Sequence, residues 1–378
     1  MNKRVLTVIG TRPEAIKMAP VVAELKSNPR FDSILCASGQ HTDLVRDALG
    51  CFGIKPDVDL DLMTEQQSLS DITARCVDRL APLVQSIEPD LVLVHGDTAT
   101  TLSAALVAFY HKVPVGHVEA GLRSGDFRNP FPEEMNRILV DRIADYCFAP
   151  TLANRQNLLA EGIAENRIIV TGNTAVDALL LMHRRVSAVG QAERIENSEG
   201  FPRFATRSGD RLVLVTAHRR ESFGEGIRSI CAAIRTLSER HADWQFLFPV
   251  HPNPNVDGVV RPLLQGRSNV HLTAPLNYEE FVYAMGRSSL ILTDSGGIQE
   301  EAPSLGKPVV LLREVTERVE AVESGNVIVA GLAAERIVEA AERLVSDEAL
   351  GARIRAGKNP YGDGMASRRI IDHLLRVL

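Results

Sequence analysis

The chain has 378 residues, of which 45% are hydrophobic and 24% are charged, so it is long enough for two or three globular domains. The formal net charge is -6 and the basic residues are scattered, which argues against a nucleic-acid-binding protein. No apolar run approaches the roughly 20 residues of a membrane-spanning helix, no signal-peptide pattern opens the chain, and the five cysteines form no C-x-x-C pair. We therefore expect a soluble cytoplasmic protein without a zinc site or a disulfide framework.

The first half of the chain alternates short apolar runs with helical patterns. The runs are too hydrophobic to have one face in water, so we interpret them as parallel strands that helices cover on both faces. This pattern predicts an α/β fold with a doubly wound sheet. The predicted strands are 5–9, 33–36, 91–94, 113–117, 146–148 and 168–170, and the predicted helices include 13–27, 69–86, 100–110 and 133–143.

A polar stretch at 186–209 interrupts the alternation and is the best candidate for a linker. We expect an N-terminal Rossmann-like domain over 1–185, onto which the C-terminal helix 365–378 packs back, and the linker with a second Rossmann-like domain over 186–364. The two domains would face each other across a cleft, with ligands outside the carboxyl ends of the strands. The later strands are predicted at 212–215, 245–248, 270–272, 290–292, 308–311 and 327–329, and the last helices at 335–345 and 366–378.

The residues after the strand at 290–292 are the first candidate for a ligand site. Ser295 follows this strand, and Gly296 and Gly297 open a helix, so backbone N–H groups can approach an anion such as phosphate. Glu301, further along the same helix, could bind sugar hydroxyls, as acidic residues do in nucleotide-binding folds. An ordinary strand-to-helix turn has the same pattern, so this stretch alone does not settle function.

Charged residues also follow the strands of the first domain. Arg12 and Lys17 come after the first strand, where two cations could bind a phosphate. Asp97 could cap the next helix, and Glu133 stands in the first turn of another, where acidic residues favour a helix. Glu119 directly after a strand is harder to explain, because burying an unpaired carboxylate is costly. Since Asp97 and Glu119 follow successive strands, they should converge, and clustered carboxylates can supply both an acid and a base.

The second domain offers cations, and the chain lacks the common cofactor motifs. His218 is followed by two arginines after the strand at 212–215, which is typical of a site for negative charge, and His251 follows the next strand. Arg318 could reach the same cleft. No NAD fingerprint follows the first strand, and no P-loop, H-E-x-x-H or G-x-S-x-G motif occurs. We expect no metal and no cofactor.

Seven motifs, taken in order and nearly from end to end, resemble the non-hydrolysing bacterial UDP-N-acetylglucosamine 2-epimerases. The resemblance implies a GT-B architecture of two Rossmann-like domains, a homodimer without metal or NAD, and a supply of UDP-N-acetylmannosamine for surface polysaccharides. The motifs are GTRPEAIKMAP at 10–20, HGDT at 95–98, GHVEAGLR at 116–123, PEEMNR at 132–137, TAHRRE at 216–221, DSGGIQEEAPSLG at 294–306 and NPYGDG at 359–364.

The resemblance also implies a reaction and its residues. UDP would leave C1 of the sugar as C2 loses its proton, and UDP and a proton would then add back to the 2-acetamidoglucal, with the proton on the opposite face. Catalytic roles would fall on Asp97, Glu119 and Glu133, with His218 near the leaving diphosphate; which carboxylate removes the proton and which returns it stays open. The UDP-sugar would contact Arg12, Lys17, Arg137, Phe281, Ser295, Gly296, Gly297, Glu301 and Arg318.

Bacterial members of the resembled family often bind a second, regulatory UDP-N-acetylglucosamine. Gln40, Arg219 and His251 match that site. Asp43 and Gln66, however, stand where the family commonly has Gln and Arg. Losing a cation and gaining an anion should weaken the binding of a diphosphate at this second site.

Three other functions remain open from the sequence. A hydrolysing 2-epimerase would carry out the same elimination and release free N-acetylmannosamine and UDP. A GT-B glycosyltransferase would need an acceptor and would not exchange the C2 hydrogen with water. A sugar-nucleotide sensor would bind without turnover, so replacing Asp97 or Glu119 would remove no activity.

Overall fold

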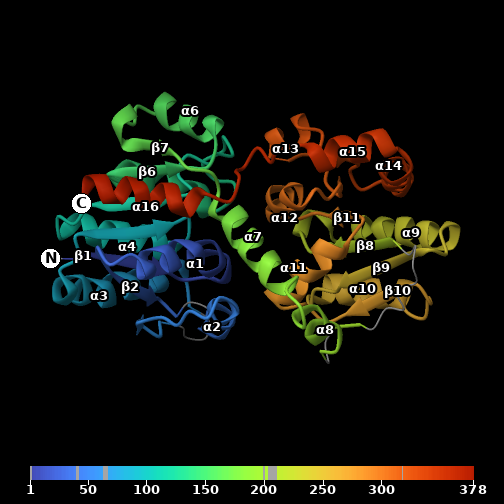
Figure 1. Cartoon of the computed structure of the whole chain (residues 1–378), viewed down its shortest axis with the longest axis horizontal. Helices are drawn as coiled ribbons and strands as arrows, with labels where there is room; N and C mark the ends of the chain where they lie inside the picture. The colour runs from blue at the N-terminus through green and yellow to red at the C-terminus, as the bar shows by residue number, and fades with distance from the viewer. Residues whose placement is uncertain (1, 40–41, 63–66, 199–200, 203–210, 317) are drawn as a thin grey trace. The chain divides into compact units, whose positions relative to one another are not determined.

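The computed structural model describes residues 2–39, 42–62, 67–198, 201–202, 211–316 and 318–378. The chain divides into two compact units, which we call unit 1 (Met1–Ala178 with Tyr361–Leu378) and unit 2 (Leu179–Pro360) (Figure 1). The division falls inside helix α7 (Thr174–Val186) and again just before Tyr361. Each unit is built around one parallel sheet, and the expected α/β class is confirmed.

Unit 1 contains a seven-stranded parallel sheet with the order β3-β2-β1-β4-β5-β6-β7. Every strand predicted in this part of the chain is present, and β3 is an additional strand of only two residues, too short to leave a pattern in the sequence. The strands are β1 (Lys3–Ile9), β2 (Phe31–Ala37), β3 (Val58–Asp59), β4 (Leu91–His95), β5 (Val115–Val118), β6 (Tyr146–Ala149) and β7 (Ile168–Val170).

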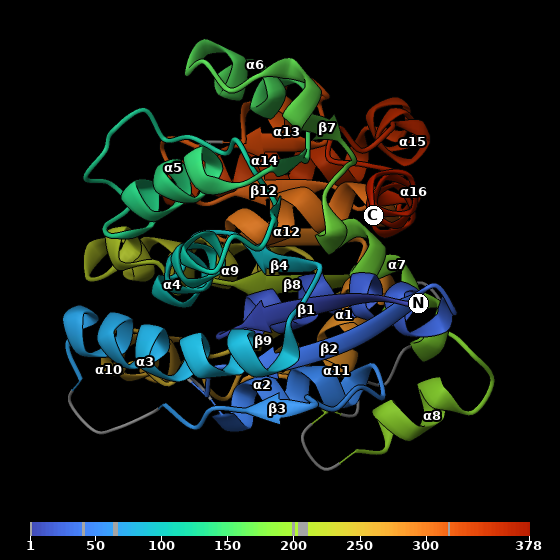
Figure 2. The same ribbon diagram turned by 90° about the vertical axis from the view of Figure 1, so that its left-hand side faces the viewer.

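Helices cover both faces of the unit 1 sheet, as the apolar strands require. Along β1, Val5 and Ile9 pack into the cluster that contains α1 and α16, whereas Leu6 and Val8 pack into the cluster that contains α3, α4 and α5. Figure 2 shows these two groups of helices on opposite sides of the strands. The helices of this unit are α1 (Arg12–Ser27), α2 (Thr42–Cys51), α3 (Leu69–Ile87), α4 (Ala99–Tyr110), α5 (Glu133–Ile143), α6 (Leu152–Ala160), the first part of α7, and α16 (Ala366–Val377).

The C-terminal helix α16 belongs to unit 1. The Asp177 carboxylate accepts hydrogen bonds from the backbone N–H groups of Ala366 at 3.2 Å and Ser367 at 2.7 Å, and so satisfies two of the free donors at the start of this helix. The buried side chains Ile370 and Leu374 then pack in the same cluster as α1. A distant carboxylate therefore caps α16, and its apolar stripe fixes it on the sheet.

Unit 2 contains a six-stranded parallel sheet with the order β10-β9-β8-β11-β12-β13. Alternate residues of its strands pack into one large core, while the intervening Leu214, Ile291 and Leu311 are also fully buried, so both faces are covered. The strands are β8 (Arg211–Thr216), β9 (Trp244–Pro249), β10 (Val270–Thr273), β11 (Leu290–Thr293), β12 (Val309–Leu311) and β13 (Val327–Val329). The helices are α8 (Gln191–Glu196), α9 (Glu225–Arg240), α10 (Pro254–Leu264), α11 (Tyr278–Arg287), α12 (Gly296–Glu301), α13 (Val319–Glu323), α14 (Ala334–Ser346) and α15 (Glu348–Ala356).

The polar stretch at 186–209 contains the short helix α8, which the sequence pattern does not predict. Contacts with α11 hold this helix in place: Arg194 forms an ion pair with Glu279, the Tyr283 hydroxyl donates to Glu196, and the Ser198 hydroxyl lies 2.9 Å from a Glu280 oxygen. The helix therefore depends on tertiary contacts rather than on an apolar stripe of its own. Residues 199–200 and 203–209 of this stretch lie outside the described part.

Both sheets reverse their strand order at one point, between β1 and β4 in unit 1 and between β8 and β11 in unit 2. Ligands of such sheets bind at the carboxyl ends of the strands near this reversal. The loops after β1, β4 and β5, and those after β8 and β11, are therefore the places to look for a site. Over the described residues, none of the helices is both long and apolar enough to span a bilayer.

Candidate active site

The Glu119 carboxylate lies at the carboxyl edge of the unit 1 sheet, directly after β5. It forms an ion pair with Lys17 of α1 and accepts a hydrogen bond from Nδ2 of Asn173 at 3.2 Å. Nε2 of His95 lies 3.8 Å from the same carboxylate oxygen. The side chain of Glu119 is only 11% exposed, so these neighbours, rather than bulk water, set the energy of its charge.

The backbone at Glu119 is in a conformation that a side chain rarely adopts. Its φ angle is 72°, in the left-handed region that favours glycine. The N–H groups of Glu119 and Ala120 each lie 3.1 Å from the carbonyl oxygen of Phe148 on the neighbouring strand β6, and these bonds hold the turn. Strained residues of this kind occur disproportionately at functional sites, and here the turn fixes the direction of the carboxylate.

Asp97 lies in the loop after β4 and is held by helix α5. Arg137 forms ion pairs with both Asp97 and Glu134, the second at 3.0 Å, and Nδ2 of Asn136 donates to the Asp97 carbonyl oxygen at 2.8 Å. The Arg137 side chain is 9% exposed, so a nearly buried guanidinium bridges two carboxylates. Asp97 does not cap helix α4, because the neighbouring Thr98 is the N-cap and accepts from the Thr101 N–H at 3.2 Å.

The structure brings Asp97 and Glu119 to the same edge. Oε1 of Glu119 would lie 3.9 Å from a β-carbon placed on Gly96, the residue that precedes Asp97. Glu133 is the first residue of α5, half-buried, one helical turn before the arginine that holds Asp97. Positions four apart on a helix share a face, so Glu133 and Arg137 are neighbours on α5.

His95, the last residue of β4, is a neutral base beside Glu119. Its ring is 3% exposed, and this burial lowers its pKa to about 3 although the Glu119 charge acts in the opposite direction. Neither ring nitrogen makes a hydrogen bond to any described residue. A neutral imidazole can donate a hydrogen bond from one nitrogen and accept one at the other. His95 is therefore compatible with both the ionised and the protonated form of Glu119.

Glu14 is a buried carboxylate to which the sequence reading assigns no role. It accepts hydrogen bonds from the backbone N–H groups of Gly10 and Thr11, both at 2.7 Å, and from the hydroxyls of Thr98 at 2.7 Å and Thr101 at 2.9 Å. Burial raises the pKa of Glu14, and the hydrogen bonds from Thr98, Gly10, Thr101 and Thr11 act against this. The residue ties the turn after β1 to the turn after β4, and so sets the positions of Lys17 and Asp97.

A buried network of ion pairs and hydrogen bonds supports the loop after β5. Nδ1 of His117 lies 2.6 Å from Asp141, whose other oxygen accepts from Arg123 at 2.7 Å and from the Gly121 N–H at 3.1 Å. Arg123 also pairs with Glu161 at 2.6 Å. Burial acts to raise the pKa of Asp141, but the contacts with His117 and Arg123 outweigh it and hold that pKa low. This ionised network fixes the residues that follow Glu119.

In unit 2, Asp294 organises the corresponding edge. This fully buried carboxylate follows β11 and accepts hydrogen bonds from the backbone N–H groups of His218 and Arg219, both at 2.8 Å, and from the Ser222 hydroxyl at 3.3 Å. The His218 ring stacks on His251, with centroids 5.7 Å apart and planes 18° from parallel. Desolvation by the surrounding protein lowers the pKa of His218, Asp294 acts against this, and Arg219 and His251 add to it.

The turn after Asp294 lies against Arg318. A β-carbon on Gly296 would be 2.9 Å from Cζ of Arg318, so only glycine leaves room for the guanidinium there. Nε of Arg318 donates to Glu300 at 3.0 Å, which keeps the arginine beside the Ser295–Gly297 turn. The predicted residues Ser295, Gly296, Gly297 and Arg318 are therefore brought together in unit 2.

The remaining predicted residues occupy separate positions. Arg12 begins α1, Phe281 is a half-buried residue in the first turns of α11, and Glu301 ends α12. Gln40 and Gln66 lie outside the described residues, and Asp43 is exposed at the start of α2.

Comparison with known proteins assigns a family over both units. The sequence model of a family described as UDP-N-acetylglucosamine 2-epimerase matches residues 23–375. A UDP-N-acetylglucosamine 2-epimerase of Yersinia pestis is 50% identical over 371 residues, and one of Escherichia coli strain K12 is 48% identical over 371 residues, each match covering 98% of both chains. The crystal structure of a UDP-GlcNAc 2-epimerase from Neisseria meningitidis bound to UDP-GlcNAc is 44% identical with a TM-score of 0.90, over 99% of this chain and 100% of that chain.

Proposed function

This chain belongs to the UDP-N-acetylglucosamine 2-epimerase family, and we propose that it interconverts UDP-N-acetylglucosamine and UDP-N-acetylmannosamine by reversible epimerisation at C2. The names of its relatives and its GT-B-type α/β fold support this function. The observation that carries it in the molecule is the pair of carboxylates, Asp97 and Glu119, at one sheet edge. Each is held by a cation, as an acid–base site requires.

The chemistry explains why two or more carboxylates are needed. The C2 hydrogen of the sugar is not next to a carbonyl, so its direct removal is unfavourable. In the proposed mechanism the C1–O bond to UDP breaks as a base takes the C2 proton, which leaves a C1–C2 double bond in a 2-acetamidoglucal. UDP then adds back at C1 while an acid returns a proton to the other face of C2. One group must therefore accept the C2 proton on one face of the sugar, and another must donate a proton on the opposite face.

We propose that Asp97, Glu119 and Glu133 are these acid–base groups. Glu119 has the strongest support, because Lys17 and the neutral His95 flank a carboxylate whose backbone is held in a strained conformation. Lys17 stabilises the ionised form, which is the form that accepts a proton. Arg137 holds Asp97 through an ion pair, and we propose that it positions this carboxylate rather than contacting the substrate directly.

We propose that unit 2 binds the UDP group. The Ser295–Gly297 turn presents backbone N–H groups, and Arg318 lies beside it as a cation for the diphosphate. His218 would stabilise the negative charge on the departing diphosphate, with its ring supported by the stacked His251. Phe281 and Glu301 would contact the nucleoside. Arg12, at the carboxyl edge of the unit 1 sheet, is a further candidate for binding the substrate.

The match to a regulatory UDP-N-acetylglucosamine site is partial. Arg219 and His251 are both neighbours of His218 in unit 2, whereas Gln40 is not among the described residues. Because Asp43 brings a negative charge, we propose that a second UDP-N-acetylglucosamine binds weakly to this protein. Activation of the enzyme by added UDP-N-acetylglucosamine in an assay of UDP-N-acetylmannosamine conversion would contradict this.

We propose that the enzyme is a cytoplasmic homodimer. Four of the five cysteines are buried thiols, as expected in a reducing compartment. Large apolar side chains of unit 1 are exposed at the end of α4 and on α5 (Phe109, Tyr110 and Leu139), and such side chains often mark an association surface. Light scattering during gel filtration should give the mass of two chains, and the mass of one chain would contradict a homodimer.

Incubation of the purified protein with UDP-N-acetylglucosamine in deuterated water tests the proposed function. We expect proton NMR to show UDP-N-acetylmannosamine with deuterium at C2, and deuterium entering the C2 position of the remaining substrate as the reaction reverses. Free N-acetylmannosamine as the main product would identify a hydrolysing enzyme instead. Product formation only with an added acceptor, without deuterium at C2, would identify a glycosyltransferase.

A further inference from the structure

A basic pocket lies in unit 2 at the amino ends of its strands, the edge opposite to the loops that carry His218 and Ser295. Arg211 begins β8, Ser289 directly precedes β11, and Lys307 comes two residues before β12. The pocket has a volume of about 380 Å³. Because the carboxyl and amino ends of parallel strands lie at opposite edges of a sheet, this pocket is distinct from the proposed substrate site.

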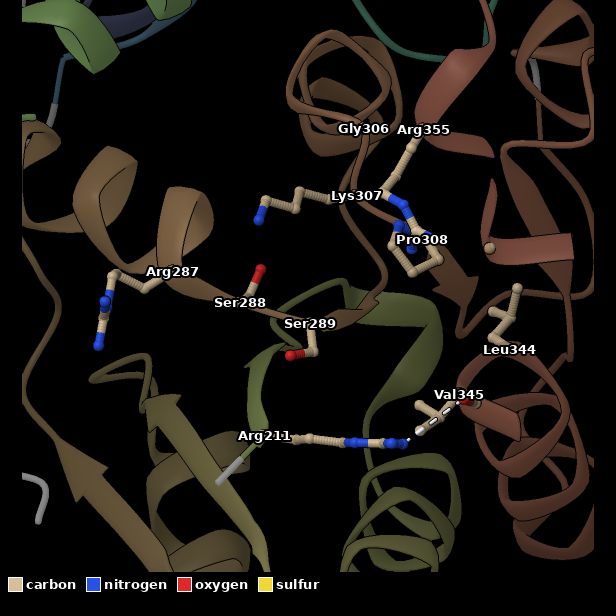
Figure 3. A pocket seen from close by; sticks show the side chains of 11 residues that line it. Arg211, Arg287, Ser288, Ser289, Gly306, Lys307, Pro308, Leu344, Val345 and Arg355 are labelled. Atoms are coloured by element: carbon tan, nitrogen blue, oxygen red, sulfur yellow. Dashed lines mark hydrogen bonds between the residues drawn. The ribbon is translucent and has the colours of Figure 1, made fainter. Parts of the chain in front are cut away.

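Four cations from separate elements line this pocket. Arg211 comes from β8, Arg287 from the end of α11, Lys307 from the loop before β12, and Arg355 from α15. Among the described residues, no aspartate or glutamate lines the pocket and none pairs with these four cations, although acidic residues outnumber basic ones in the chain by 48 to 42. Figure 3 shows Lys307 extending over Ser288, and Arg211 running past Ser289 toward Val345.

The contacts of these cations are weak. Within the described residues, the hydrogen bond that Arg211 donates is a long one, 3.5 Å, to the Val345 carbonyl oxygen. Desolvation lowers the pKa of the half-buried Lys307, and the charge of Arg287 lowers it further. The described part of unit 2 therefore gathers like charges in this pocket at some cost in free energy, and none of its carboxylates lines the pocket to offset them.

Gly351 of α15 lies close to the guanidinium of Arg355. Gly351 lies in the interior of this helix, where glycine is less stable than alanine by about 0.5–1 kcal/mol. A β-carbon at this position would lie 3.2 Å from Nη1 of Arg355, four residues further along. The glycine thus accommodates the guanidinium, although the flexible Arg355 side chain could make room for an alanine by a shift of a few tenths of an ångström.

Helix ends explain part of this charge but not its arrangement. Arg287 and Arg355 stand in the last turns of α11 and α15, where a cation interacts favourably with the helix dipole. Lys307 and Arg211 lie in no helix. A dipole interaction also does not require cations from four elements to line one pocket.

We propose that this basic pocket binds a small phosphate-bearing anion, held by Lys307 and Arg211 with the Ser289 hydroxyl as a further donor. Arginine and lysine are the side chains that proteins use for phosphate, and a multiply charged anion would neutralise the unpaired cations. The modest volume suits a compact ligand such as pyrophosphate or a phosphorylated small metabolite rather than a large polyanion.

Calorimetric titration with inorganic pyrophosphate tests this proposal. The titration is done with the full chain at low salt and in saturating UDP, so that the proposed substrate site is occupied. We expect one pyrophosphate per chain, with binding that weakens as salt increases. Lys307→Ala and Arg211→Ala should each weaken binding about tenfold, the usual effect of losing one charge-assisted hydrogen bond.

Arg353→Ala is the matched control. This exposed arginine lies on the same helix as Arg355 but does not line the pocket, so its replacement should leave the pyrophosphate affinity unchanged. Binding that UDP abolishes, or that survives both Lys307→Ala and Arg211→Ala, would overturn the proposal. A titration with ATP in place of pyrophosphate shows which part of the ligand the pocket recognises. Equal affinities for ATP and pyrophosphate support recognition of the phosphate groups alone. Binding of ATP without binding of pyrophosphate overturns the proposal. Arg211 is exposed, so its variant keeps the test valid if Lys307→Ala does not fold.

Discussion

Each unit uses a buried carboxylate to hold the point where its strand order reverses, but the carboxylate comes from a different side of that point in each unit. In unit 1, Glu14 reaches from the helix after β1 to Thr98 and Thr101 beyond β4, and ties the two sides of the strand-order reversal together. In unit 2, Asp294 reaches from the end of β11 back to the backbone N–H groups of His218 and Arg219 beyond β8. A buried carboxylate thus holds each reversal point, but it comes from the first strand's side in one unit and from the fourth strand's side in the other.

The comparison also separates two kinds of carboxylate. Glu14 and Asp294 accept hydrogen bonds mainly from neutral N–H and O–H groups. Their carboxylate oxygens thereby hold the backbone in place. Glu119 and Asp97 are instead paired with the cations Lys17 and Arg137. A carboxylate surrounded by fixed backbone donors is suited to support a fold, whereas one paired with a side-chain cation can exchange a proton with a ligand.

The largest expected effect is on catalysis by Glu119. Replacing it by glutamine keeps the shape of the side chain but removes the charge that accepts a proton. We expect turnover to fall by about 10³–10⁴-fold, the upper range for general acid–base catalysis, and deuterium incorporation at C2 to fall with it. Because this change leaves the largely buried Lys17 without its carboxylate partner, urea unfolding should also show a loss of stability, but the variant should remain folded under assay conditions.

Glu165→Gln provides the control for this prediction. Glu165 is also paired with an arginine in unit 1, but it is a surface residue, and exposed ion pairs contribute little. We expect its turnover to equal that of the wild type. If Glu119→Gln retained more than a tenth of the activity, Glu119 would belong with the supporting carboxylates instead.

A smaller, purely structural effect should follow from changing Glu14 or Asp294. Alanine at either position leaves several buried donors without an acceptor, so we expect a loss of about 3 kcal/mol or more in the free energy of unfolding. Trp244, the single tryptophan, lies in unit 2, so its fluorescence reports on the change at Asp294, while circular dichroism covers both units.

The same two variants also test the distinction between carboxylates that support the fold and carboxylates that act in acid–base catalysis. It fails if Glu14→Ala or Asp294→Ala abolishes turnover at a temperature where the variant is still fully folded. In that case the residue would act on the reaction directly. A loss of activity that tracks the unfolded fraction would support a role in holding the backbone.

Sequence patterns could predict the fold and the edge on which each candidate residue lies. Parallel strands that are buried on both faces leave long apolar runs, so the residue after each run, such as Asp97 or Glu119, falls at the carboxyl edge. The prediction that the fold is α/β with two doubly wound sheets is confirmed. The catalytic roles of these residues stay predictions.

Side-chain partners were beyond the reach of those patterns. Glu14 reads as a helix-start residue in the sequence, because its hydroxyl partners Thr98 and Thr101 lie more than 80 positions away. The role of Asp294 depends in the same way on backbone donors from another strand, and α8 depends on side chains of α11. Periodicity records which face of an element is buried, but it does not record which distant group is opposite.

The smallest effect concerns two histidines, one in each unit, and their response to pH. Burial of His95 lowers its pKa from 6.5 to about 3 in the folded protein, so between these values the unfolded chain holds a proton that the folded chain does not. Stability contributed by neutral His95 is therefore complete above pH 6.5 and is lost as the pH falls toward 3, by about 1.4 kcal/mol per pH unit. We expect the unfolding free energy of His95→Gln, measured in urea from pH 7 to pH 5, to fall less steeply than that of the wild type.

His218→Gln is the counterpart in unit 2. Its pKa is lowered too, but its side chain is 41% exposed, so solvent should screen most of the effect and the variant should follow the wild-type slope closely. Equal slopes for the wild type and His95→Gln would show that His95 takes up a proton in the folded protein. The imidazole beside Glu119 would then be a charged partner of the carboxylate, and unit 1 would hold its acid–base group between two cations rather than one.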